Sequence, residues 1–210
     1  MITIHHLGVS QSDRIVWLME ELGLPYKLTW YDRDPKTGGA PKEYLALHPT
    51  ATAPVITDGD LVLTDSNAIV EYICQRHAQG KLCIAPDSIL YPDYLYWMQY
   101  HNHLLSVFFG KSGLSDETAE SGFAKILQRR EDSYYQHLNN HLATSDFLVG
   151  NELTCADILI MFDLTTFPLF GGKTLEGLDH VQAYVERVST RPAYQKAMAL
   201  AGPSAKNPNA

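Results

Sequence analysis

Two serines near the N-terminus are the first residues whose type and spacing suit chemistry. Ser10 and Ser12 lie in the segment Ser10-Gln11-Ser12-Asp13-Arg14, between a short apolar stretch and an amphipathic helical pattern. A serine hydroxyl at the start of a helix can cap the helix by accepting a backbone N–H. It can also donate a hydrogen bond to an anion, which the helix N-terminus attracts as well. The spacing alone favours capping and leaves the second role open.

A hydrolase nucleophile at Ser10 does not fit the pattern. Gly8-Val9-Ser10 after a strand is similar to the start of a nucleophile elbow, but Ser12 stands where that motif has its closing glycine. The serine also follows the first strand of the chain, which is too early for the usual order of Ser, Asp and His in a large sheet. We therefore do not expect a hydrolase.

Two histidine pairs have spacings that metal ligands use. They are His101-x-His103 and His137-x-x-x-His141, and the second pair would share one helical face. Neither pair has a convincing third ligand nearby in the sequence. We therefore expect no metal and interpret these residues as surface or hydrogen-bonded histidines.

Strand and helix patterns alternate over the first 80 residues. Apolar runs between turn residues predict four strands, at residues 2–6, 26–31, 55–57 and 61–63. Apolar residues at helical spacing follow the first strand, a short helix follows Pro41, and a third helix follows Asp65 or Ser66, either of which can cap it. The β-α-β start implies a parallel pair, and Asp58-Gly59 marks a hairpin between the last two strands. The order is βαβαββα.

The pattern changes between Gln79 and Pro86, and from Ser88 onward only helical periodicity is found. The sequence therefore predicts two domains, 1–80 and 88–210. The predicted helices of the second domain cover residues 88–110, 115–142, 154–167, 178–190 and 192–200. Thr154 and Asp157 form a capping-box pattern at the start of the third of these helices.

An aromatic stripe lies at helical spacings early in the second domain. Its members are Tyr96, Tyr100, His103, Phe108 and Phe109. Such a stripe is usually part of a core. Part of it can line a pocket for an apolar ligand, because ligand sites favour aromatic walls.

Composition excludes several function classes. The chain of 210 residues carries a formal net charge of -8 and has no compact Lys/Arg cluster, which argues against binding to nucleic acid. No stretch of about 18 apolar residues and no signal-peptide pattern occurs, so we expect no membrane association and a cytoplasmic location. The three cysteines form no CxxC pair, which fits a reduced compartment.

Four segments in order resemble motifs of the cytosolic glutathione transferases, in particular the serine-type members. They are residues 10–14, 48–55, 65–69 and 154–158. The second segment has His48 where the family pattern has Asn, and Ala51 where it has Gly. The likeness covers nearly the whole chain. It implies a thioredoxin-like α/β N-terminal domain (βαβαββα) followed by an all-α C-terminal domain.

The resemblance implies a role for each motif. It makes Ser10 the residue that stabilises the thiolate of glutathione, with Ser12 as the helix cap and as the alternative catalytic residue. It also implies a cis Ala53-Pro54 bond that turns the Val55 backbone toward the ligand. The predicted glutathione-binding residues are Thr52, Ala53, Pro54, Val55, Asp65 and Ser66.

The resemblance also implies the reaction and the partners. Glutathione would be a co-substrate that attacks a small hydrophobic electrophile, as in detoxification, and the protein would be a homodimer. The predicted pocket for the electrophile is lined by Tyr96, Tyr100, His103 and Phe108. The segment from Tyr100 to His103 departs from related serine-type sequences, which leaves the identity of the electrophile open.

Two alternatives remain at this point. The same thiolate can serve a glutathione-dependent peroxidase or disulfide reductase, which differs only in its acceptor. The fold can also persist as a binding or regulatory module without turnover, because fold does not determine function.

Overall fold

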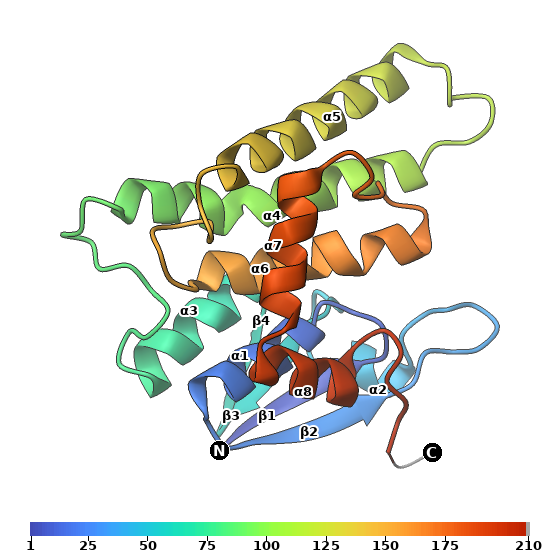
Figure 1. The fold of residues 1–210 in the computed structure, drawn as a ribbon. Coiled ribbons are helices and arrows are strands. Elements are labelled where there is room, and N and C mark those ends of the chain that lie inside the picture. Colours follow the sequence, from blue (N-terminus) through green and yellow to red (C-terminus); the bar gives the residue numbers. More distant parts are fainter. Residues whose placement is uncertain (209–210) are drawn as a thin grey trace. The chain divides into compact units, whose positions relative to one another are not determined.

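A computed structural model describes residues 1–208 of the chain (Figure 1). It contains two compact units. The first comprises Met1–Cys83 and the chain from Ser189 onward, and the second comprises Ile84–Val188. The last two residues of the predicted helical domain, 209–210, lie outside the described residues.

The first unit is built on a four-stranded mixed sheet with the strand order β2-β1-β3-β4. Its strands are β1 (Ile2–Leu7), β2 (Tyr26–Tyr31), β3 (Val55–Asp58) and β4 (Leu61–Thr64). β1 and β2 run parallel, and β3 is antiparallel to both β1 and β4. The four predicted strands are confirmed to within one residue at each end, as are the parallel pair and the hairpin.

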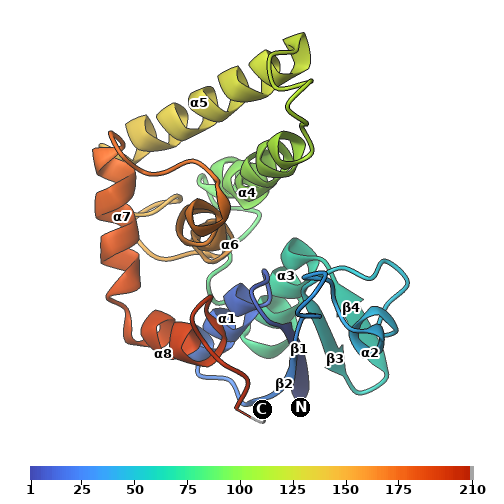
Figure 2. The ribbon, with the colours of Figure 1, turned by 90° about the vertical axis from the view of Figure 1, so that its right-hand side faces the viewer.

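Helices cover both faces of this sheet. They are α1 (Asp13–Leu22), α2 (Lys42–Leu45) and α3 (Ser66–His77). Figure 2 shows α1 and α3 on one side of the sheet and α2 on the other. Successive side chains of a strand point to opposite faces, so Leu7 packs with Tyr44 of α2, whereas His6 reaches Ser12 at the start of α1. α1 ends at Gly23, whose φ of 65° is left-handed.

The first unit also includes the last helix, α8 (Pro192–Ala201), which packs against α1. The ring of Trp17 meets that of Tyr194 edge to face, with centroids 5.0 Å apart. Arg191 pairs with both carboxylate oxygens of Glu21. The predicted second domain, 88–210, therefore differs from the observed second unit, because α8 buries its apolar side against the first.

The second unit is helical. Its elements are α4 (Tyr91–Ser112), α5 (Gly122–Leu142), α6 (Cys155–Thr165), the 3-10 helix η1 (Phe167–Phe170) and α7 (Asp179–Ser189). α4 packs against both α5 and α6. Among the described residues, no helix combines the length and apolar character that a membrane span requires.

The predicted and observed helix boundaries in this unit differ most at the start of α5. α5 begins at Gly122 and not at Ser115, because Ser115 and Thr118 close a hydrogen-bonded turn first. Ser121 then caps the helix by accepting the N–H of Ala124 at 3.1 Å. The helix predicted to extend to residue 167 ends at Thr165, after which the chain tightens into η1.

The predicted capping box at the start of α6 is confirmed. The fully buried Asp157 carboxylate accepts the backbone N–H of Thr154 at 2.8 Å and that of Leu148 at 3.0 Å. It also accepts the Tyr184 hydroxyl of α7 at 2.8 Å. One carboxylate thus joins the start of α6 to the loop before it and to α7.

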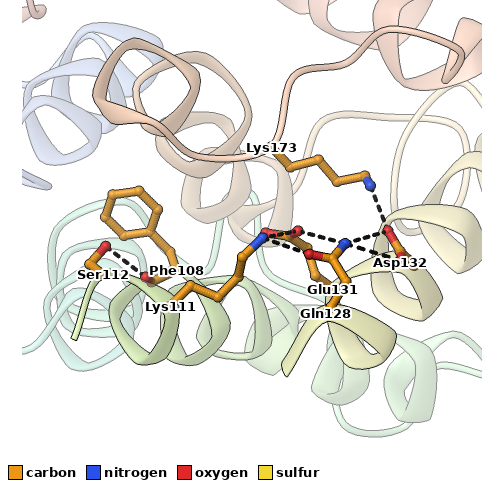
Figure 3. Close-up of polar contacts among 7 residues, drawn as sticks. All are labelled: Phe108, Lys111, Ser112, Gln128, Glu131, Asp132 and Lys173. Carbon is orange, nitrogen blue, oxygen red and sulfur yellow. Dashed lines mark hydrogen bonds and ion pairs between the residues drawn. The ribbon is translucent and has the colours of Figure 1, made fainter. Parts of the chain in front are cut away.

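A polar cluster links α4, α5 and the loop after η1 (Figure 3). Lys111 Nζ lies 2.6 Å from Glu131 Oε2 and 3.0 Å from Gln128 Oε1. Lys173 Nζ lies 2.7 Å from Oδ1 of Asp132, which also accepts Gln128. Glu131 is nearly buried, with 7% of its side chain exposed, whereas 54% of the Asp132 side chain is exposed. The two ion pairs therefore differ in their access to water.

Candidate functional site

Three of the four motif segments meet at one end of the sheet of the first unit. β1 leads into the turn that carries Ser10. Because β3 runs antiparallel to β1, its first residue, Val55, lies opposite His5, near the end of β1. Val55 also pairs with Thr64, the last residue of β4, and Ser66 follows two residues later. The topology thus places the predicted ligand-binding segments of the first domain at the same end of the sheet.

A chain of short hydrogen bonds connects the two serines to a strand histidine. The Ser10 hydroxyl donates to the carbonyl oxygen of Leu7 at 2.6 Å. The hydroxyl oxygens of Ser10 and Ser12 are 2.7 Å apart, and Ser12 Oγ lies 2.8 Å from Nδ1 of His6. Ser12 is fully buried and Ser10 is 6% exposed. Of the two serines, Ser10 is therefore the one with exposed surface.

The side chain of Ser12 does not cap α1, contrary to the prediction. Ser12 occupies the N-cap position, but its φ and ψ are helical and its side chain makes no capping hydrogen bond within the described residues. The reason is that its hydroxyl is engaged by His6 and Ser10. The backbone carbonyl of Ser12 still accepts the N–H groups of Ile15 and Val16.

His6 is a functional candidate that the sequence reasoning missed. Its side chain is fully buried on the α1 side of the sheet, and its ring contacts that of Trp30 with centroids 4.3 Å apart. Burial, and after it the positive charge of Arg33, lowers the pKa of His6 to about 4. His6 is therefore neutral at pH 7. A lone histidine in an apolar strand carries no local signal of this role.

Arg33 holds the turn that precedes Ser10. Its guanidinium donates to the carbonyl oxygens of Gly8 at 2.6 Å, Val9 at 3.0 Å and Gly38 at 2.9 Å. Val9 adopts a left-handed φ of 49°, which is unfavourable for a β-branched residue. The two hydrogen bonds to Gly8 and Val9 stabilise this conformation and so position Ser10. The sequence reasoning did not identify Arg33.

Gln11 joins the serine turn to the N-terminus of α3. Its Oε1 accepts a hydrogen bond from Arg14 Nη1 at 3.1 Å. The same oxygen accepts the Ser66 hydroxyl at 3.4 Å, a long hydrogen bond. Gln11 lies in the first motif and Ser66 in the third, so the two motifs are in direct contact.

The corner before α3 places a capping carboxylate and a nearly buried serine at a helix N-terminus. Asp65 has a left-handed φ of 77° and caps α3 by accepting the N–H of Ala68 at 3.0 Å. Asp65 is exposed, whereas Ser66, the first residue of the 12-residue helix, is 4% exposed. A helix N-terminus attracts an anion through its backbone N–H groups. The prediction that Asp65 can cap this helix is confirmed.

The segment from Thr52 to Val55 enters β3. The Ala53-Pro54 peptide bond is cis, as the resemblance implied. Thr64 donates its hydroxyl to the Pro54 carbonyl at 2.8 Å and lies 3.2 Å from the hydroxyl of the exposed Thr52. These contacts tie the segment to the end of β4.

Three of the four predicted pocket residues gather between α4 and α5. Tyr100 is 1% exposed, and its hydroxyl donates to the Tyr134 carbonyl at 2.7 Å. The ring of His103 stacks on that of Tyr134 at 4.9 Å, and Tyr96 meets Tyr100 edge to face. Tyr96 is 46% exposed. The structure thus makes Tyr100 part of the helical core.

Phe108 belongs to a different aromatic group. Its ring stacks on Phe167 of η1 with centroids 4.0 Å apart and an interplanar angle of 1°. Phe109 and Phe162 contact the same Phe167 ring edge to face. The structure therefore divides the predicted stripe into two groups, one against α5 and the other, with Phe108, against α6 and η1.

The histidine pairs take part in the packing of the second unit. His101 is buried. The ring of His137 stacks on Trp97 at 5.6 Å, and His141 contacts the same indole at 4.4 Å. Nε2 of His141 lies 3.0 Å from the Leu148 carbonyl oxygen. Both residues of the second pair thus pack against Trp97, and His141 is hydrogen-bonded as well.

Comparison with known proteins identifies the family. Residues 10–76 match the model of the glutathione S-transferase N-terminal domain, and residues 96–192 match that of the C-terminal domain. The chain is 35% identical to a glutathione S-transferase of known structure from Actinobacillus pleuropneumoniae, with a TM-score of 0.84 over 97% of this chain and 95% of that one. The chain belongs to the glutathione S-transferase family. The predicted family, enzyme class and fold class are confirmed.

Other members of the glutathione S-transferase family are similar over nearly the same length. Glutathione S-transferase 3 of Schizosaccharomyces pombe is 27% identical over 92% of this chain and 85% of its own. A theta-class glutathione S-transferase from Xanthomonas axonopodis pv. citri, solved with glutathione bound, is 27% identical. It superposes with a TM-score of 0.68 over 96% of this chain and 98% of that one.

Proposed function

We propose that the protein binds glutathione along the end of the sheet where the three motif segments meet. The Ser10 hydroxyl stabilises the thiolate of glutathione, which attacks a small apolar electrophile. The observation that carries this proposal is the position of Ser10. Ser10 is the more exposed of two hydrogen-bonded serines, and it lies in the turn after β1, whose residue His5 pairs with Val55.

The energetics of thiol activation fit a hydroxyl donor. A thiol similar to that of cysteine has a pKa of about 8.5, and lowering it by ~2 units requires about 2.7 kcal/mol. A hydrogen bond to a charged group contributes about 1.5–3 kcal/mol, and a helix N-terminus adds about 0.3–1 kcal/mol. Ser10 lies just before α1, so the hydrogen bond and the helix N-terminus can both stabilise a thiolate at this position. The hydroxyl keeps its proton throughout, unlike a hydrolase serine.

The start of α3 and the segment that enters β3 supply the remaining contacts that we propose for glutathione. We assign the γ-glutamyl carboxylate to the Ser66 hydroxyl and the N–H groups at the start of α3. The long Ser66–Gln11 hydrogen bond is one that a carboxylate can replace. Asp65, which is exposed, balances the γ-glutamyl ammonium. The backbone of Val55 pairs with the cysteinyl part of glutathione as a strand would, with Thr52, Ala53 and Pro54 beside it.

We propose that the electrophile is apolar. Within the helical unit, large apolar side chains around η1 are exposed and are available to an apolar ligand. Phe109, Leu169 and Phe170 are 60%, 62% and 57% exposed, next to the stacked rings of Phe108 and Phe167. Aromatic walls are typical of small-molecule sites. Of the predicted pocket residues, this argument favours Phe108 and does not depend on Tyr100.

The proposal includes a homodimer in the cytoplasm with a role in detoxification. Exposed apolar residues in and just before α4, and in α5, support an interface between two copies; they are Ile89, Leu95, Phe123 and Ile126. Cytoplasmic thiols are kept reduced, as a glutathione-dependent reaction requires. Light scattering at micromolar concentration tests the dimer, and a mass near 23.5 kDa would contradict it.

The decisive experiment titrates bound glutathione through its thiolate absorbance in the wild type and in Ser10→Ala. We expect the variant to raise the pKa of the bound thiol by about one to two units, or ~1.4–2.7 kcal/mol. Its loss of activity at neutral pH should shrink as the pH rises, because the thiol then ionises unaided. Ser106→Ala, which removes an exposed hydroxyl of α4, is the control. An unchanged titration in Ser10→Ala would refute thiolate stabilisation by this residue.

A panel of acceptors then separates the catalytic alternatives. It contains an aryl halide, an epoxide, an enone, a hydroperoxide and a mixed disulfide, each assayed with glutathione. Turnover of the first three supports the transferase proposal. Turnover of only the last two would indicate a peroxidase or disulfide reductase, and retention on immobilised glutathione without any turnover would indicate a binding module.

A further inference from the structure

The hydrogen bonds around Ser10 and Ser12 require three hydrogen atoms. The three contacts are Leu7 O to Ser10 Oγ at 2.6 Å, Ser10 Oγ to Ser12 Oγ at 2.7 Å, and Ser12 Oγ to His6 Nδ1 at 2.8 Å. Each distance is that of a hydrogen bond, so each contact must hold one hydrogen. The two serines supply one hydroxyl hydrogen each, and a carbonyl supplies none. The third hydrogen must come from His6.

This count determines the direction of the whole chain. With a hydrogen on Nδ1, His6 donates to Ser12, Ser12 donates to Ser10, and Ser10 donates to the Leu7 carbonyl. If the hydrogen were on Nε2 instead, Ser12 would donate to Nδ1. The single Ser10 hydrogen could then serve only one of its two contacts, that with the Leu7 carbonyl or that with Ser12 Oγ. In the other contact, two oxygens would lie 2.6 or 2.7 Å apart with no hydrogen between them. Only the Nδ1–H tautomer satisfies every contact.

Two further observations agree with this tautomer. Nε2 of His6 is buried and has no hydrogen-bond partner among residues 1–208. A protonated Nε2 would leave a buried donor unsatisfied, and a doubly protonated ring would bury a charge as well, which is more costly. In addition, the backbone N–H of Ser12 points to Ser10 Oγ at 3.4 Å. The Ser10 oxygen therefore also accepts from the Ser12 backbone, which agrees with its role as an acceptor in the hydrogen count.

We propose that His6 is a positioning residue for thiolate stabilisation, acting as a neutral donor through Ser12. This inference rests on the proposed function of Ser10. Because Ser12 donates to the Ser10 oxygen, the Ser10 hydrogen has two possible acceptors: the Leu7 carbonyl, or the sulfur of bound glutathione. Consecutive hydrogen bonds polarise one another, which strengthens the last donor of the chain. No proton passes along the chain, and the thiol proton leaves to solvent.

The first test reads the tautomer of His6 in the unmodified protein. Nitrogen NMR of ¹⁵N-histidine-labelled protein distinguishes a ring nitrogen that carries hydrogen from one that does not, and the spectrum of His6→Asn identifies the His6 signals. We expect hydrogen on Nδ1 and none on Nε2 at neutral pH. The opposite tautomer, or a doubly protonated ring, would overturn the proposal whatever the activity of the enzyme.

The second test measures the pKa of the bound glutathione thiol in two His6 variants. His6→Leu removes the donor, and we expect it to raise this pKa by about half to one unit, which lowers the thiolate fraction about three- to tenfold at pH values well below the pKa. The amide N–H of an asparagine lies close to the position of Nδ1–H, so His6→Asn should keep the pKa near that of the wild type. If His6→Leu does not fold, the NMR experiment still decides.

His5 provides the matched control, because it is the neighbouring histidine on the opposite face of the same strand. It contacts Tyr31 at 3.1 Å and Thr57 at 3.2 Å and takes no part in the serine chain. His5→Leu should leave the thiol pKa unchanged. If Ser10→Ala shifts the pKa and His6→Leu does not, the role of His6 is refuted while the proposed function stands. If Ser10→Ala itself does not shift the thiol pKa, the proposed function of Ser10 and the role of His6 are both refuted.

Discussion

The hydroxyl oxygens of Ser10 and Ser12 lie 2.7 Å apart, yet only Ser10 has exposed surface. In the proposed site, Ser12 would therefore act on a ligand only through Ser10. We predict that Ser12→Ala raises the pKa of the bound glutathione thiol, but by less than Ser10→Ala does. It should also lower the free energy of unfolding by about 1–3 kcal/mol, because the buried His6 donor loses its acceptor.

Thiolate absorbance and urea denaturation measure the two effects of Ser12→Ala separately. Ser12→Thr is the matched variant, since it keeps a hydroxyl at the same position. A Ser12→Ala enzyme with a larger shift in thiol pKa than Ser10→Ala would make Ser12 the direct partner of the thiolate. The order of the two shifts thus decides which serine contacts the sulfur.

Ser66→Ala should weaken glutathione binding more than it slows the chemistry. In the proposed site, the hydrogen bond from Ser66 to the γ-glutamyl carboxylate is expected to be similar in the ground state and in the transition state. Its loss therefore raises KM for glutathione and changes kcat little. A hydrogen bond to a charged group contributes about 1.5–3 kcal/mol, so KM should rise about tenfold or more. Steady-state kinetics with Ser106→Ala as control measure this, and an unchanged KM would remove Ser66 from the site.

Asp13 should make the protein less stable as the pH rises. Burial raises the pKa of this carboxyl from 3.8 to about 7, with Arg14 opposing the shift. Because the folded state holds the proton more tightly than the unfolded state, its contribution is fully present below about pH 4 and is lost as the pH rises through about 7. Asp13→Asn should remove this loss and stabilise the protein at pH 8 by about 2–4 kcal/mol. Urea denaturation at pH 5 and pH 8 measures this difference in the free energy of unfolding, with Asp60→Asn, at an exposed position, as the control.

His6 has the opposite effect in the same pH range. Its pKa falls from 6.5 to about 4, mainly through burial, so the unfolded state binds the proton first. The stability contribution of His6 is therefore present above pH 6.5 and is lost as the pH falls toward about 4. We predict that His6→Asn reduces the loss of stability on acidification, whereas Asp13→Asn makes stability rise more steeply between pH 4 and 6.5. Equal slopes in both variants would contradict these assignments.

Lys111 and Glu131 should contribute more to stability than the neighbouring Lys173 and Asp132 (Figure 3). Lys111→Met leaves the nearly buried Glu131 carboxylate without its cation, which should cost about 1–3 kcal/mol. Lys173→Met removes a partner of the exposed Asp132 and should cost at most about 1 kcal/mol. Urea denaturation of both variants measures the difference. A larger loss in Lys173→Met would contradict the argument from burial.

The sequence by itself determined the elements and the family. Local patterns predicted the four strands to within a residue, the stop of α1 at Gly23 and the capping box of Asp157. These features depend on neighbours within a few positions, where turn chemistry and side-chain periodicity act directly. The motif around Ser10 likewise predicted a site in the turn after β1, which the proposed experiments test.

The tertiary structure decided which partners the site residues have. Nothing local indicates that His6 bonds to Ser12, that Arg33 holds the turn before Ser10, or that Gln11 accepts from Ser66, 55 residues away. Likewise, helical periodicity predicted α8 but not its packing on α1, and it did not predict the division of the aromatic stripe between two neighbours. Such contacts depend on sheet register and helix packing, which bring distant residues to hydrogen-bonding distance only once the chain has folded.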